Sequence, residues 1–145
     1  AVEQSTSEPG KQQAQSQDKY TQFEDLKHAL DKGEHTRSVS INGEKYLTQS
    51  AELVPGSKVF NVLMKEYGTV KDSIVVISDS LDENALKQGF SVSAVFKLAK
   101  NTYRVVPQDK SAIYALYRGL DKDKQIQTAE LQIDFSGALK KQANY

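Results

Sequence analysis

The chain has 145 residues, 38% of them hydrophobic and 26% charged, which is typical of one globular domain with a sizeable core. Its 19 basic and 19 acidic residues balance to a net charge of zero, which argues against a general nucleic-acid or anionic-membrane binder. The lack of cysteine excludes disulfides, thiol catalysis and cysteine-ligated metals, and no run approaches the ~18 apolar residues that a membrane-spanning helix needs.

Residues 1–18 are rich in Gln, Ser and Glu and hold few large apolar side chains. Such a segment cannot bury enough surface to offset its ordering entropy, so we expect a flexible leader. It precedes a single globular domain at 19–138 and a tail at 139–145. The alternative is that the leader is a spacer, which holds the domain away from a membrane or a secretion machine. The first residues, Ala-Val-Glu, fit either an exported protein after signal-peptide cleavage or a chain trimmed to that point.

An amphipathic helix is predicted next. Thr21 and Glu24 have the spacing of a capping box, and Gly33 stands where a helix often ends in a left-handed residue. Between these ends, apolar side chains recur on one helical face: Tyr20, Phe23, Leu26 and Leu30. We expect this face to pack on a sheet, and the alternative is that it binds a partner.

The middle of the chain reads as strands joined by turns. Residues 35–41 and 44–50 flank Asn42 and Gly43, the pair most favoured in a type I′ hairpin turn because both positions need a positive φ. Residues 58–66 fit either a helix or a strand, because their apolar positions match both periods.

A central strand is predicted at 73–79, where a continuous apolar run follows a turn at Gly68. Ser80 and Glu83 then have the spacing of a second capping box. This pair predicts one or two helical turns that end at Gly89.

Alternation of polar and apolar residues dominates the rest of the chain. Residues 90–99 and 102–107 form a predicted hairpin around Asn101, and two further strands, 111–118 and 125–135, are joined by a charged turn. The predicted fold class is therefore α+β and predominantly antiparallel β, with about eight strands and one N-terminal amphipathic helix packed against them. A small barrel or a curled sheet is preferred to a two-sheet sandwich.

The order of these features resembles the VirK-type proteins of Gram-negative bacteria. The resembling stretches are KYTQFEDLKHALDKGEHTRSVSI, SIVVISDSL and VSAVFKLAKNTYRVVP, and the likeness runs from about Tyr20 to Phe135. In that family the strand after the first helix often carries a cysteine, which residues 39–42 lack. The resemblance implies an exported protein, periplasmic or secreted, that is found with virulence and secretion loci, and it implies no reaction.

The sequence contains no constellation for catalysis or metal binding. His28 and His35 would share one helical face with Asp31, but Gly33 interrupts the helix, so two exposed histidines are expected rather than a metal site. There is no Gly-x-Ser-x-Gly elbow and no Walker or Rossmann glycine pattern. We therefore expect a protein that is not an enzyme and holds no cofactor.

The predicted binding surface is a stretch in which basic and aromatic residues interleave, an arrangement that suits nucleic acids, acidic glycans or an acidic protein surface. Its residues are Lys97, Lys100, Tyr103, Arg104, Tyr117 and Arg118. The alternative is that the tyrosines fill the core and the basic residues line a solvated face. In the predicted hairpin Lys97 and Arg104 come close across the strands, where like charges cost stability unless water, carboxylates or an acidic partner offset them.

The expected function is that of an exported, monomeric, non-enzymatic binding module in bacterial virulence or envelope biology. Its expected partner is a protein of the host or of the secretion machinery, and no nucleic-acid partner is expected. The alternative is a β-barrel carrier of an apolar small molecule, although the bulky Phe90, Phe96 and Phe135 would fill such a barrel.

Overall fold

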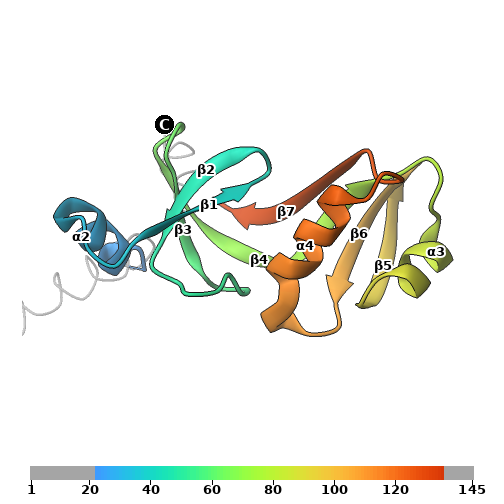
Figure 1. Ribbon diagram of the computed structural model, residues 1–145, viewed down its shortest axis with the longest axis horizontal. Helices are drawn as coiled ribbons and strands as arrows, with labels where there is room; N and C mark the ends of the chain where they lie inside the picture. The colour runs from blue at the N-terminus through green and yellow to red at the C-terminus, as the bar shows by residue number, and fades with distance from the viewer. Residues whose placement is uncertain (1–21, 136–145) are drawn as a thin grey trace, which may run out of the picture.

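The computed structural model describes residues 22–135, whose strands form one open antiparallel sheet with helices beside it (Figure 1). The strands are β1 (Arg37–Ile41), β2 (Glu44–Thr48), β3 (Lys58–Asn61), β4 (Glu66–Ile77), β5 (Val92–Ala99), β6 (Thr102–Pro107) and β7 (Thr128–Asp134). The helices are α2 (Glu24–Lys32), α3 (Glu83–Gly89) and α4 (Ile113–Lys122), with the short 3₁₀ helix η1 (Lys110–Ala112) before α4. The predicted leader at 1–18 and tail at 139–145 lie outside the described residues.

Strand β4 is the central strand of the sheet and pairs with β3, β6 and β7. The strand order is β1-β2-β3-β4-β6-β5, and β7 lies off this path. β3 pairs with residues 66–69 of β4, β6 pairs with residues 74–77, and β7 runs beside both segments. The register shifts between Val70 and Ile74, an irregularity of the kind that bends a strand. The molecule is elongated, with α2 and β1 to β3 toward one end and α3, β5 and β6 toward the other (Figure 1).

This architecture confirms the predicted α+β class and the predominantly antiparallel sheet. The barrel prediction is wrong, because β1 and β5 end the strand order and do not pair with each other within residues 22–135. The described part of the chain contains seven strands and three α-helices, rather than about eight strands and one helix.

The main difference concerns residues 111–118, which were predicted as a strand and belong instead to η1 and α4. Ile113, Tyr117 and Leu120 are spaced by four and three residues, the helical period, and all three are buried. The Asp109 side chain caps the η1 turn at the start of this helix. Isoleucine and tyrosine are common in strands, but packing one helical face onto the sheet overrides that weak preference.

Helix α2 is confirmed as a helix, and Gly33 ends it with a φ of +68°, as predicted. Its N-cap position is Phe23 rather than Thr21, which lies outside the described residues. The Phe23 ring stacks on the Tyr67 ring of β4, with centroids 5.3 Å apart. α2 thus contacts one end of the sheet, whereas α4 is the helix that packs against β4 and β7 (Figure 1).

Two predicted turns have different outcomes. Asn42 and Gly43 join β1 and β2 with φ values of +55° and +78°, which confirms the predicted hairpin. Helix α3 does not use Ser80 as its cap: the Asp82 side chain accepts a hydrogen bond from the Ala85 N–H at 2.9 Å. A carboxylate directly before the first helical residue satisfies a free N–H and also meets the positive end of the helix dipole.

Gly68 was predicted as a turn and lies instead inside β4, opposite Val59 of β3. A Cβ at this position would lie 2.5 Å from Ile133 Cγ2 and 2.9 Å from Phe135 Cε1, closer than packed atoms tolerate. Glycine is therefore needed here because the side chains of Ile133, in the neighbouring strand β7, and of Phe135 lie directly against this backbone.

One face of the sheet carries the core, and the other is partly bare. A single cluster of buried side chains connects strands from both ends of the sheet with α4, including Ile41, Val59, Ile74, Val105, Ile113 and Leu131. On the opposite face near β5, Ile77, Phe96 and Leu98 are 40%, 46% and 54% exposed. These three side chains lie outside the core, and no helix covers them within the described residues.

Candidate functional site

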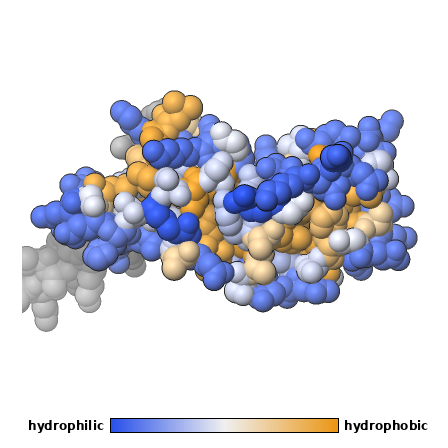
Figure 2. Space-filling view, viewed as in Figure 1, coloured by the Kyte–Doolittle hydropathy of each residue, from blue (hydrophilic) through white to orange (hydrophobic). Residues whose placement is uncertain are grey.

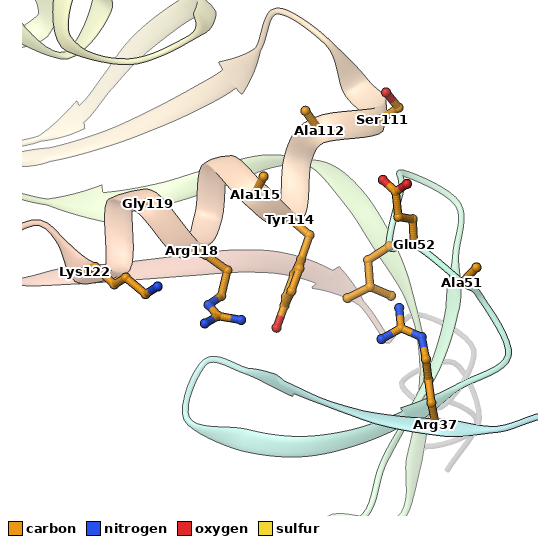
Figure 3. A pocket seen from close by; sticks show the side chains of 11 residues that line it. Arg37, Ala51, Glu52, Ser111, Ala112, Tyr114, Ala115, Arg118, Gly119 and Lys122 are labelled. Carbon is orange, nitrogen blue, oxygen red and sulfur yellow. The ribbon is translucent and has the colours of Figure 1, made fainter.

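An open cleft of about 720 Å³ lies between α4 and the segment that follows β2; we call it the α4 cleft (Figure 3). Its lining residues are Arg37, Ala51, Glu52, Leu53, Ser111, Ala112, Tyr114, Ala115, Arg118, Gly119 and Lys122. Figure 2 shows apolar surface in the depression between the part of the molecule that holds α4 and the part that holds β1 and β2. The cleft therefore combines an apolar base with polar side chains around it.

Helix α4 is held in place over the β1–β2 hairpin by two tyrosine hydroxyls. The Tyr114 hydroxyl donates to the Ser40 carbonyl at 2.9 Å, and the Tyr117 hydroxyl accepts from the Asn42 N–H at 2.7 Å. Tyr117 is buried, and burial raises its pKa above the usual 10.0, against the opposing effect of the Asn42 N–H. Both contacts fix the rotation of α4, and Arg118 and Lys122, further along the helix, line the cleft.

The opposite wall is the segment 50–53, which is anchored at both ends. Leu53 is fully buried in the core, and the Ser50 N–H donates to the Thr48 hydroxyl at 3.1 Å. The Arg37 Nε donates to the Ser50 carbonyl, at 2.6 Å. This wall is therefore a constrained turn rather than a loose loop, and it brings Glu52 to the cleft.

Three cations and one carboxylate line the cleft. Arg37, Arg118 and Lys122 approach it from β1 and α4, and the Arg118 guanidinium carbon lies 5.8 Å from the centre of the Tyr114 ring (Figure 3). Within the described residues none of these three cations forms an ion pair, and the carboxylate of Glu52 forms none either. The cleft therefore has an excess of positive charge that no ion pair within residues 22–135 neutralises.

A second groove, of about 470 Å³, runs along the other side of α4. Phe90, Pro107 and Leu116 give it a more apolar wall. The two grooves share Ala112, Ala115 and Gly119, the small side chains on the outer surface of the helix. Small residues at this position lower the ridge between the grooves, so a ligand in the α4 cleft can approach the helix backbone closely.

The structure divides the predicted binding residues among four locations. Tyr103 and Tyr117 are buried in the core, as in the alternative interpretation. Arg118 lines the α4 cleft. Arg104 lies on the uncovered face of the sheet, with its guanidinium carbon 4.4 Å from the Phe96 ring centre. Lys97 and Lys100 are exposed at the β5–β6 hairpin.

The predicted hairpin around Asn101 is confirmed as β5 and β6. Its register differs from the one assumed, because Lys97 lies opposite Tyr103 and Arg104 lies opposite Phe96. Neighbouring positions on a strand point to opposite faces, so Lys97 and Arg104 do not meet. No charge repulsion between them needs to be offset.

Arg37, Glu52, Tyr114 and Lys122 belong to the cleft and are not among the predicted binding residues. Three cleft residues, Tyr114, Arg118 and Lys122, are spaced by four residues and therefore share one face of a helix. That signal was available, but reading 111–118 as a strand ended the element before Lys122 and assigned Lys122 to the following turn. Arg37 and Glu52 carried no local signal, because only the tertiary fold brings them to α4.

In the part of the chain that the structure describes, no group of three or more histidine, aspartate or glutamate side chains is arranged to hold a metal ion. None of the described helices is both long enough and apolar enough to cross a membrane.

No protein-family model matches the chain, and no curated protein is similar to it. Among solved structures, it resembles a chain in the crystal structure of the complex between an Aeromonas sobria serine protease and a chaperone. The TM-score is 0.52 at 15% sequence identity, and the match covers 69% of this chain and 95% of that chain. The likeness is one of fold.

Proposed function

We propose that this protein is an exported, non-enzymatic binding module that acts as a chaperone-like partner of another exported protein, with the α4 cleft as its binding surface. The observation that carries this proposal is the cleft itself: a partly apolar depression whose three cations have no ion-pair partner within residues 22–135. Charged groups left unpaired around an apolar base are typical of a surface that is completed by a partner.

Two further points support the proposal. The structural neighbour is a chain of a protease–chaperone complex. The match covers 69% of this 145-residue chain and 95% of the neighbouring chain, so the neighbouring chain is itself small, as fits the chaperone. The resemblance to VirK-type proteins supports export and a place in virulence or envelope biology. The carrier alternative loses its basis, because the sheet is open and both grooves beside α4 open to the surface.

The test is co-expression of the complete gene with each neighbouring gene that encodes an exported protein. We expect one client whose soluble, correctly folded yield rises when this protein is present and which co-purifies with it from the periplasm or the medium. Arg118→Glu with Lys122→Glu should abolish co-purification, whereas Lys124→Glu, a charge reversal beyond the end of α4, should not. Retention of the protein in the cytoplasm would contradict the proposed export, and equal behaviour of both variants would contradict the proposed surface.

A further inference from the structure

We propose that the occupant of the α4 cleft is an extended, acidic segment of the partner protein. This inference deepens the proposed function and rests on it: the cleft recognises carboxylate side chains that alternate with small or apolar ones.

Charge complementarity is the first argument. The cleft presents Arg37, Arg118 and Lys122 against the single carboxylate of Glu52, in a chain whose net charge is zero. The positive excess is therefore local to this surface and is not a property of the whole molecule. Carboxylates of a partner would complete ion pairs that the described residues do not form, and arginine can bind a carboxylate through two parallel hydrogen bonds.

The shape of the cleft is the second argument. Its α4 wall includes the small residues Ala112, Ala115 and Gly119, which let a main chain lie close to the helix. The Tyr114 ring forms part of the same wall, and its hydroxyl is already bound to the Ser40 carbonyl, so the ring is fixed as an apolar contact surface (Figure 3). A groove with this low helical wall fits an extended segment with small side chains, whose main chain can lie close to α4.

The distribution of charge favours a polypeptide over a nucleic acid. A phosphate backbone needs a continuous run of cations, whereas here Glu52 interrupts the wall, and Asp121 lies beside Arg118 and Lys122 in the adjoining hollow. An acidic peptide can place its carboxylates at the three cations and uncharged residues opposite Glu52 and Asp121.

The experiment measures fluorescence anisotropy of a labelled peptide of about ten residues, long enough at about 3.4 Å per residue to follow α4. Aspartates alternate with glycine and alanine in the probe, and the control peptide has asparagine in place of every aspartate. We expect the acidic peptide to bind the full chain, the asparagine peptide to bind at least about tenfold more weakly, and added salt to weaken the acidic peptide.

Substitutions then locate the site. Arg118→Gln and Lys122→Gln should each weaken binding severalfold, and Ala115→Gln should weaken it by filling the groove from an exposed helical position. Lys124→Gln removes the same charge close by but outside the cleft, so it should bind like the original chain. All four positions are exposed, so we expect each variant to keep the fold. Thermal unfolding of each variant checks this.

Three results would overturn the inference. The first is an equal loss of peptide affinity in Lys124→Gln and in Arg118→Gln, which would mean that the peptide is held by general charge attraction. The second is displacement of the peptide by single-stranded DNA of equal charge at equal concentration, which means a polyanion site. The third is that no acidic peptide binds, although the client co-purifies with the original chain and fails to co-purify with the double variant Arg118→Glu and Lys122→Glu. In that case the protein-binding function stands and only the acidic occupant is wrong.

Discussion

The side-chain amide of Asn42 forms two hydrogen bonds with the main chain of Leu131. Its Nδ2 donates to the Leu131 carbonyl at 2.9 Å, and its Oδ1 accepts from the Leu131 N–H at 2.8 Å. The amide thus occupies the free edge of β7 where a neighbouring strand would otherwise pair. Because the Asn42 N–H also donates to Tyr117, one turn residue joins the β1–β2 hairpin to β7 and α4, and so shapes the α4 cleft.

We expect Asn42→Ala to lower the free energy of unfolding by about 2–4 kcal/mol, since two partly buried main-chain groups lose their partner and alanine is strained at a φ of +55°. Asn101→Ala is the matched control, because Asn101 has a φ of +61° and its side chain forms no hydrogen bond within the described residues. The difference between the two variants in urea unfolding measures the amide contacts alone. A difference near zero would mean that these contacts do not stabilise the fold.

Gly68→Ala should destabilise the protein by about 1–3 kcal/mol, because its Cβ would overlap Ile133 and Phe135. Gly119→Ala is the opposite case: it lies within α4, and an added Cβ meets no atom within 4 Å. Alanine there should stabilise the protein by about 0.5–1 kcal/mol through helix propensity. Urea midpoints of the two variants should therefore move in opposite directions, and a neutral Gly68→Ala would show that β7 does not press on β4.

Leu26→Ala tests whether α2 is part of the folded unit. Leu26 is 2% exposed, so its truncation should cost about 2–4 kcal/mol, and the half-buried Leu30 should cost less. His28→Ala, on the exposed side of the same helix, should be near zero. Equal and negligible effects of all three in chemical denaturation would mean that α2 separates readily from the sheet.

Stability should fall in alkaline solution because of buried tyrosines. Burial raises the pKa of Tyr46 and of Tyr117 above 10.0 in the folded protein. The unfolded chain then loses these protons first, so the stabilising contribution is complete below pH 10 and declines as the pH rises through the raised folded values. Urea unfolding at several alkaline pH values should show this slope, and Tyr46→Phe with Tyr117→Phe should flatten it. An unchanged slope would assign the decline to other groups, such as Tyr67, whose pKa burial also raises.

Local chemistry decided several elements from the sequence alone. Asn42 and Gly43 specify a hairpin because both turn positions need a positive φ, and Gly33 ends α2 for the same reason. Alternation of polar and apolar residues identified β7, and the turn at Asn101 identified the hairpin of β5 and β6. These features depend on residues a few positions apart, so a single sequence contains all the information that they need.

The tertiary structure decided the rest. Residues 111–118 satisfy either period, and the apolar face of the sheet selects a helix by burying Ile113 and Tyr117. Gly68 is a strand residue because β4 pairs with β3 there, and only the fold brings the distant Ile133 side chain against it. The candidate site has the same origin, because Arg37 and Lys122 line one cleft only when the fold brings β1 to α4. Strand register matters as well, since a shift of one residue moves a side chain to the other face of the sheet. Contacts between distant residues carry no local sequence pattern, which is why the cleft could be found only in three dimensions.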